Sequence, residues 1–133
     1  MSNKETQNFL GIDWGLKKIG LAIANSEIKI AFPFQVVNSL EEVIDVIDKE
    51  MIDVVVLGEP LKFISSEDLN QDFIDFYQKL KKELFIRKKK FFLFDERLTS
   101  RQADFLIANK KVKTEQDAVA AMLILEGFFE KNF

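Results

Sequence analysis

The chain has 133 residues, of which 47% are hydrophobic, and a net charge of −3. It contains neither histidine nor cysteine, which excludes imidazole bases, thiol nucleophiles, zinc–thiolate sites and disulfides. The hydrophobic content predicts a folded chain, and the length is that of one domain, so we expect a single domain over 1–133. The acidic balance counts against a general nucleic-acid binder, which is typically basic.

The segments that would direct the protein to a membrane are not found in the sequence. No apolar run approaches the roughly 20 residues of a membrane span. The N-terminus is polar and lacks the hydrophobic core of a signal peptide. We therefore expect a cytoplasmic protein without a membrane partner.

Three apolar runs at the beginning of the chain predict strands over 8–13, 18–25 and 28–37. The short links between them favour an antiparallel meander. Gly15 is expected to supply conformational freedom in the first turn. Pro33 indicates an edge position or a bulge in the third strand.

Helices and strands alternate in the remainder of the chain. Ser39-Leu40-Glu41-Glu42 is a capping box that opens a helix. The strand–helix–strand units that follow imply parallel strands. We expect an α/β fold with a mixed sheet covered by helices on both faces. The later elements are a strand over 54–58, a loop over 61–67, a helical stripe from Leu69 to Leu84, a strand over 91–96, a short helix from Thr99 to about Asn109, and a last helix with its apolar face from Ala118 to Phe129.

Three carboxylates occupy positions that packing explains poorly. Asp13 ends the first strand, Glu96 ends the fifth, and Asp117 opens the last helix. Charged groups at buried positions are normally paired or bound to metal. Strand alternation places Gly11 beside Asp13, which leaves space for an ion. Converging carboxylates would form a site for a hard cation, Mg²⁺ or Mn²⁺.

Each of these carboxylates also has an ordinary interpretation. Asp117 could close a capping box with Thr114. Glu96 could pair with Arg97, and Asp13 could cap the turn through Gly15. The occurrence of all three in this order is the observation that favours a metal site.

Basic residues flank all three carboxylates, although the chain as a whole is acidic. They could hold the phosphates of a nucleic acid, or they could form a solvated charged surface. These residues are Lys17, Lys18, Arg97, Arg101, Lys110, Lys111 and Lys113.

Three motifs together resemble the YqgF (RuvX) family of ribonuclease H-like proteins. They read Asp13-x-Gly15-x-Lys17-Lys18-Ile19-Gly20, then Asp95-Glu96-Arg97-Leu98-Thr99-Ser100, then Asp117-x-x-Ala120-Ala121. The resemblance implies a five-stranded ribonuclease H-like sheet whose first three strands are antiparallel. It also implies a metal-dependent nuclease, with Asp13, Glu96 and Asp117 as catalytic ligands of Mg²⁺ or Mn²⁺. The nucleic-acid-binding residues would be Lys17, Lys18, Arg97, Thr99 and Arg101.

The same resemblance suggests the substrate. Members of the family are regarded as maturing the 5′ end of 16S ribosomal RNA, and were earlier proposed as Holliday-junction resolvases. Precursor 16S RNA is therefore the favoured partner and branched DNA the alternative. We expect a monomer or a weak homodimer.

The chain departs from the family pattern at several positions. Lys18 stands where the family usually has arginine, and Glu59 stands where it has leucine. A glycine-containing loop of the family is replaced over 63–68. Two other functions stay open: a non-catalytic nucleic-acid-binding module and an actin-fold kinase. The kinase would need two such domains, for which the chain is too short.

Overall fold

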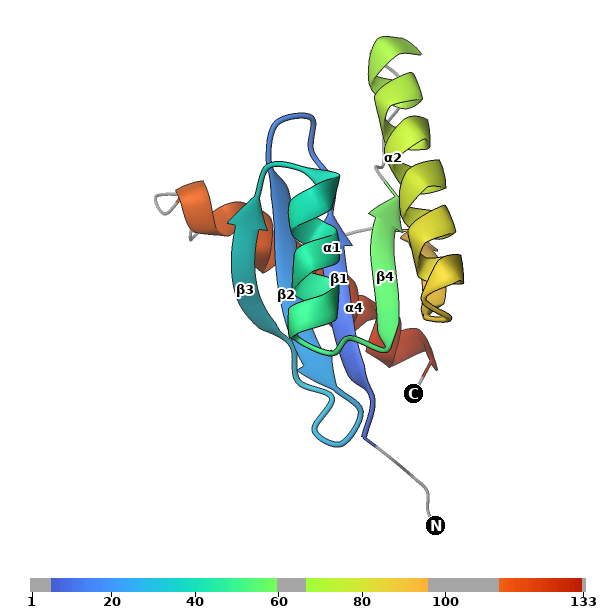
Figure 1. The fold of residues 1–133 in the computed structure, drawn as a ribbon. Helices are drawn as coiled ribbons and strands as arrows, with labels where there is room; N and C mark the ends of the chain where they lie inside the picture. Colours follow the sequence, from blue (N-terminus) through green and yellow to red (C-terminus); the bar gives the residue numbers. More distant parts are fainter. Residues whose placement is uncertain (1–5, 60–66, 96–112, 133) are drawn as a thin grey trace.

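The computed structural model describes residues 6–59, 67–95 and 113–132, and its centre is a five-stranded sheet (Figure 1). The strands follow the spatial order β3-β2-β1-β4-β5. β2 pairs antiparallel with β1 and β3, whereas β4 pairs parallel with β1 and β5. The predicted mixed sheet with three antiparallel strands is thus confirmed. The strands are β1 (Asn8–Asp13), β2 (Ile19–Asn25), β3 (Phe32–Val37), β4 (Val54–Glu59) and β5 (Lys90–Asp95).

Helices cover both faces of the sheet. The three helices described are α1 (Leu40–Lys49), α2 (Glu67–Ile86) and α4 (Lys113–Asn132). Figure 1 shows α1 in front of the sheet and α4 behind it. The predicted loop over 61–67 and helix over 99–109 fall outside the described residues, except that residue 67 begins α2.

Each face of the sheet carries its own hydrophobic core, because strand side chains alternate between faces. The core on the α1 and α2 side includes Leu10, Ile12, Val43, Ile47, Leu57, Leu80 and Leu84. The core on the α4 side includes Phe9, Ala22, Ala24, Val56, Ala121, Leu125 and Phe128. None of the described helices has both the length and the hydrophobicity that a membrane crossing requires.

The third strand begins later than its apolar pattern predicts. The segment after β2 is a turn in which Asn25 Oδ1 accepts hydrogen bonds from the backbone N–H groups of Glu27 and Ile28, at 3.1 and 2.9 Å. Lys29 then adopts a left-handed conformation, with φ of 61°. A strand cannot start until the chain leaves this turn, so β3 begins at Phe32 and not at residue 28.

The prediction made from Pro33 is confirmed in both of its forms. β3 is an edge strand, and its pairing with β2 shifts register between Leu21 and Ala22. Proline cannot donate to a ladder, and an edge strand with an irregularity tolerates it.

The capping box at the start of α1 is also confirmed. Ser39 Oγ accepts a hydrogen bond from the Glu42 N–H at 3.2 Å, and Glu42 Oε1 accepts one from the Asn38 N–H at 2.6 Å. The Ser39 hydroxyl thus satisfies one donor that the helix itself leaves unpaired, and the Glu42 carboxylate binds the N–H of the residue before the cap instead of that of Ser39.

We predict that Ser39→Ala lowers the free energy of unfolding by about 1 kcal/mol, because it removes the cap acceptor. Ser39→Asn restores an acceptor and is the matched control. Urea unfolding measures both. An equal loss in the two variants would show that the cap hydrogen bond is not the cause.

Candidate active site at the carboxyl edge of the sheet

The carboxyl ends of β1, β4 and β5 lie at one edge of the sheet, because these three strands are parallel. Asp13 is the last residue of β1 and is half-buried. Its partner across the antiparallel ladder is Gly20 in β2. Residues directly opposite each other in such a ladder point to the same face. Asp13 therefore lies on the face that Gly20 presents.

Gly20 presents the face that α4 covers. A Cβ atom built on Gly20 would collide with the backbone carbonyl of Asp117 and would lie 2.9 Å from the nitrogen of Ala118. Only the absence of a side chain at residue 20 lets this part of α4 lie so close to β2. Asp117, itself half-buried, is thereby brought to the same face and the same end of the sheet as Asp13.

The same close approach continues along α4. A Cβ atom on Gly11 would lie 2.6 Å from Leu125 Cγ and 2.8 Å from the carbonyl oxygen of Ala121. Gly11 and Asp13 share a face, so two contacts, at Gly11 and Gly20, fix the helix over this face of β1 and β2. The space at Gly11 that the sequence analysis assigned to an ion is therefore occupied by α4, and that expectation is wrong.

The structure contradicts two expectations from the sequence, the capping box at Thr114 and the conformational freedom of Gly15. α4 begins at Lys113, so Thr114 lies inside the helix and not at its N-cap. No described glycine has a positive φ. Gly15 therefore does not serve the turn through a left-handed conformation. Glycine is needed at residue 15 for lack of space, because a Cβ atom there would lie 2.5 Å from the carbonyl oxygen of Lys18.

The predicted phosphate-binding residues divide into two groups. Lys17 and Lys18 are exposed in the loop that joins β1 to β2, directly after Asp13. The loop begins and ends at the carboxyl edge, so these two cations are near the carboxylates. The predicted residues that lie outside the described part of the chain are Glu96, Arg97, Thr99 and Arg101.

The structure adds one carboxylate to this edge that the sequence analysis did not select. Glu59 ends β4, half-buried, in register with Asp95 of β5. Val55 and Leu57 belong to the core on the α1 and α2 side, so alternation turns Glu59 to that face. It therefore lies on the opposite face from Asp13. The signal that could have found it is its position as the last residue of a parallel strand.

The described residues alone do not complete a metal-binding set. Within 6–59, 67–95 and 113–132, no three acidic side chains gather closely enough to hold an ion. Two of the three predicted ligands, Asp13 and Asp117, are brought to one end of one face, and the third lies outside these ranges. Carboxylate oxygens are suitable donors for a hard divalent cation.

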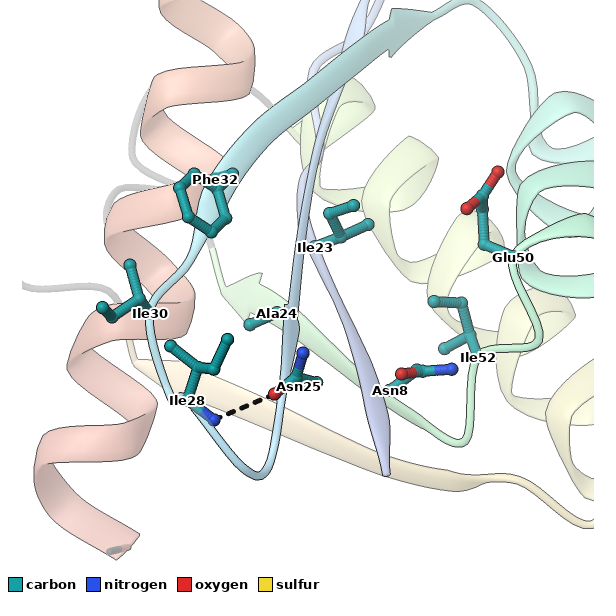
Figure 2. Close-up of a pocket in the computed structure, with 9 residues that line it drawn as sticks. All are labelled: Asn8, Ile23, Ala24, Asn25, Ile28, Ile30, Phe32, Glu50 and Ile52. Atoms are coloured by element: carbon teal, nitrogen blue, oxygen red, sulfur yellow. Dashed lines mark hydrogen bonds between the residues drawn. The ribbon is translucent and has the colours of Figure 1, made fainter. Parts of the chain in front are cut away.

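A cavity of about 210 Å³ lies at the other end of the sheet and is shown in Figure 2. Asn8 and Asn25, which face each other at the start of β1 and the end of β2, line it. Asn8 and Asp13 are five positions apart along β1, which corresponds to roughly 17 Å. The other residues that line the cavity are mostly apolar and include Ile23, Ile28, Ile30, Phe32 and Ile52. The cavity is separate from the carboxylate edge.

Comparison with solved structures defines the class of protein. *Thermus thermophilus* RuvC in complex with a Holliday junction superposes with a TM-score of 0.63 at 16% identity, covering 95% of each chain. The fowlpox virus Holliday junction resolvase superposes with a TM-score of 0.55 at 15% identity, covering 95% of this chain and 99% of its own. At these identities the likeness concerns the fold, which is that of ribonuclease H-like resolvases.

Comparison of sequences then identifies the family. The family model described as "RuvX: Holliday junction resolvase" matches residues 7–131. An *Orientia tsutsugamushi* protein named "Putative pre-16S rRNA nuclease" is 33% identical over 136 residues, covering 94% of this chain and 85% of its own length. A *Chlamydia muridarum* protein of the same name is 32% identical, covering 98% and 97%. The chain belongs to the RuvX family, and it is a nuclease, a hydrolase that acts on nucleic acid.

We predict that Gly20→Ala lowers the free energy of unfolding by about 1–3 kcal/mol, because the new methyl group meets rigid backbone of α4. Gly127→Ala is the control, since a Cβ atom there meets only ring atoms of Phe94, at 3.0 and 3.1 Å, and alanine favours the helix. The free energy of unfolding of Gly127→Ala, measured in urea, should fall by less than about 1 kcal/mol. Equal losses of stability in the two variants would contradict the idea that the backbone of α4 leaves no space for a side chain at residue 20.

Proposed function

We propose that the chain hydrolyses phosphodiester bonds at the carboxyl edge with the help of divalent metal, and that it matures the 5′ end of precursor 16S ribosomal RNA. The observation that supports the site is the contact of the Asp117 backbone with Gly20, directly across the ladder from Asp13. The relatives named as pre-16S rRNA nucleases, at 32–33% identity over nearly the whole chain, support the substrate.

Asp13, Asp117 and Glu96 are the proposed ligands of Mg²⁺ or Mn²⁺. The donor set fits such an ion, because the chain has no histidine or cysteine and oxygen ligands suit hard cations. When bound, the ion supplies charge for activating water and for stabilising the leaving oxygen.

The chain's own cations are proposed to hold and orient the substrate. Lys17 and Lys18 are exposed beside Asp13 and can contact backbone phosphates without reading the bases. Arg97, Thr99 and Arg101 are proposed for the same role on the strength of their motif. Positioning the phosphate next to the carboxylates makes the attack effectively unimolecular, which lowers the barrier.

Branched DNA is the second candidate substrate, since the family model is described by Holliday junction resolution. The resolvase structures that superpose on this chain are only 15–16% identical to it, so they support a shared fold and not a shared substrate. A cleavage assay with a precursor 16S fragment and a four-way junction, each with Mn²⁺, separates the two. Cleavage of the junction with the RNA left intact would overturn the choice of RNA.

We predict that Asp13→Asn abolishes cleavage while the melting temperature stays the same or rises. Repulsion between clustered carboxylates falls when one is neutralised, so the fold does not need the charge. In addition, Mn²⁺ should raise the melting temperature of the unmodified protein but not of the variant.

The matched control for this experiment is Asp45→Asn, which makes the same chemical change at an exposed position of α1. It should retain cleavage and the thermal response to Mn²⁺. If Asp13→Asn lowers the melting temperature clearly and keeps activity, the proposed role of Asp13 is wrong.

We also predict that the affinity for RNA falls steeply with salt, by roughly 0.7 log units per log unit of salt for each phosphate neutralised on a single strand. Lys17→Ala should flatten this slope by about one contact, whatever the RNA sequence. Lys79→Ala, on the exposed side of α2, is the control and should leave the slope unchanged. Equal flattening at the two positions would indicate non-specific attraction.

A further inference from the structure

Trp14, the residue that follows Asp13, packs on the opposite face of the sheet. Asp13 ends β1 on the face that α4 covers. The indole of Trp14 packs against the core on the α1 and α2 side, with its ring centroid 5.5 Å from that of Phe73 and 6.4 Å from that of Phe76. Both phenylalanines belong to α2 and are buried. Trp14 is therefore half-buried, although it lies just outside the strand.

The contact between Trp14 and α2 is made at the carboxyl edge of the sheet. Figure 1 shows that the first part of α2 extends beyond the carboxyl end of β4. Phe73 and Phe76 lie in the first half of this helix. The rings of Trp14 and Phe73 meet at 69°, an edge-to-face arrangement in which the positive edge of one ring meets the negative face of the other. Such a contact is directional, so it fixes the orientation of the indole as well as its position.

The end of β1 is consequently held from both faces of the sheet. On one face, Asp13 pairs with Gly20, and the backbone of Asp117 fills the space beside Gly20. On the other face, Trp14 is held by the rings of α2. The two residues share a planar peptide unit, so fixing the indole limits rotation of the backbone at Asp13. Ends of elements open most easily, and this end is the one that carries the carboxylate.

The turn that carries the two lysines has a constraint of its own. A Cβ atom on Gly15 would lie 2.5 Å from the carbonyl oxygen of Lys18, so the turn closes tightly on itself. Lys17 and Lys18 follow in this turn and are exposed. Their position therefore depends less on the contact with α2 than that of Asp13 does. This difference separates an effect on the carboxylate from an effect on phosphate binding.

We propose that Trp14 is a positioning residue, which holds the Asp13 carboxylate in place by anchoring the end of β1 to α2. The inference rests on the proposed function, because it concerns the geometry of the same site. Reaction rates are sensitive to such geometry, and a misplacement of about 1 Å can cost about 100-fold. The groups that orient a metal ligand similarly affect how well the ligand binds its ion.

Trp14→Leu tests this role, because it removes the ring and keeps an apolar side chain. The kcat for RNA cleavage should fall about tenfold, and more Mn²⁺ should be needed for half-maximal activity. The KM and the salt dependence of RNA affinity should stay the same, because both lysines are retained. Trp14→Phe keeps a ring against α2 and should recover most of the activity. A rise in KM with kcat unchanged would overturn the proposal.

The matched control is Phe9→Leu, at the other end of the same strand. Phe9 is buried and contacts Phe128 and Phe129, so this variant should lose stability and keep its kcat. Phe73→Leu removes the partner ring on α2 and should reproduce the effect of Trp14→Leu. The double variant should be no slower than either single variant, because both changes break one contact. Additive losses, or an equal loss of kcat in Phe9→Leu, would show general destabilisation instead.

Two measurements test the anchoring without cleavage. Hydrogen exchange in peptides that cover residues 11–20 should be faster in Trp14→Leu than in Phe9→Leu. Mn²⁺ should raise the melting temperature of Trp14→Leu less than that of the unmodified protein. If the unmodified protein neither cleaves RNA nor responds to Mn²⁺, the proposed function is wrong, and the exchange alone decides whether Trp14 holds the strand end. Unchanged exchange in Trp14→Leu would refute the anchoring even where the proposed function holds.

Discussion

The absence of a side chain at Gly20 is the constraint on which the arrangement of the carboxyl edge depends. The backbone of Asp117 occupies the space that a Cβ atom of residue 20 would fill. Gly20 is fixed in turn by its register with Asp13 across β1 and β2. The helix start and the strand end are therefore held together by backbone contacts.

The composition of the core on this face follows from the same close approach. Near the carboxyl edge, β1 and β2 present Gly11, Gly20 and Ala22 to α4, which leaves no room there for large strand side chains. Toward the other end of the sheet, the strand and the helix both contribute large aromatic residues. Phe128 and Phe129 pack against Phe9, with ring centroids 6.3 and 5.1 Å apart. Small residues near the proposed site and large ones away from it therefore keep the helix in contact with the sheet.

The sequence predicted the elements and their order well, because their signals are local. Each of these signals depends on only a few neighbouring residues, as in the apolar runs, the Ser39 capping box and Pro33. The errors arose where a side-chain hydrogen bond or the position of a helix start overrides the local pattern. The hydrogen bonds of Asn25 convert an apolar stretch into a turn and delay β3. The start of α4 at Lys113 moves Thr114 into the helix, contrary to a four-residue pattern that predicted a cap.

The candidate site was predictable only in part, because one of its signals is local and the others depend on the fold. Asp13 stands out because a charge at the end of an apolar strand has no packing explanation. Its proximity to Asp117 depends on Gly20, and a glycine in a strand indicates a close approach without naming what approaches. The face on which Glu59 lies follows from strand alternation, counted from neighbouring residues that lie in the core. Only the folded sheet shows which core those residues belong to.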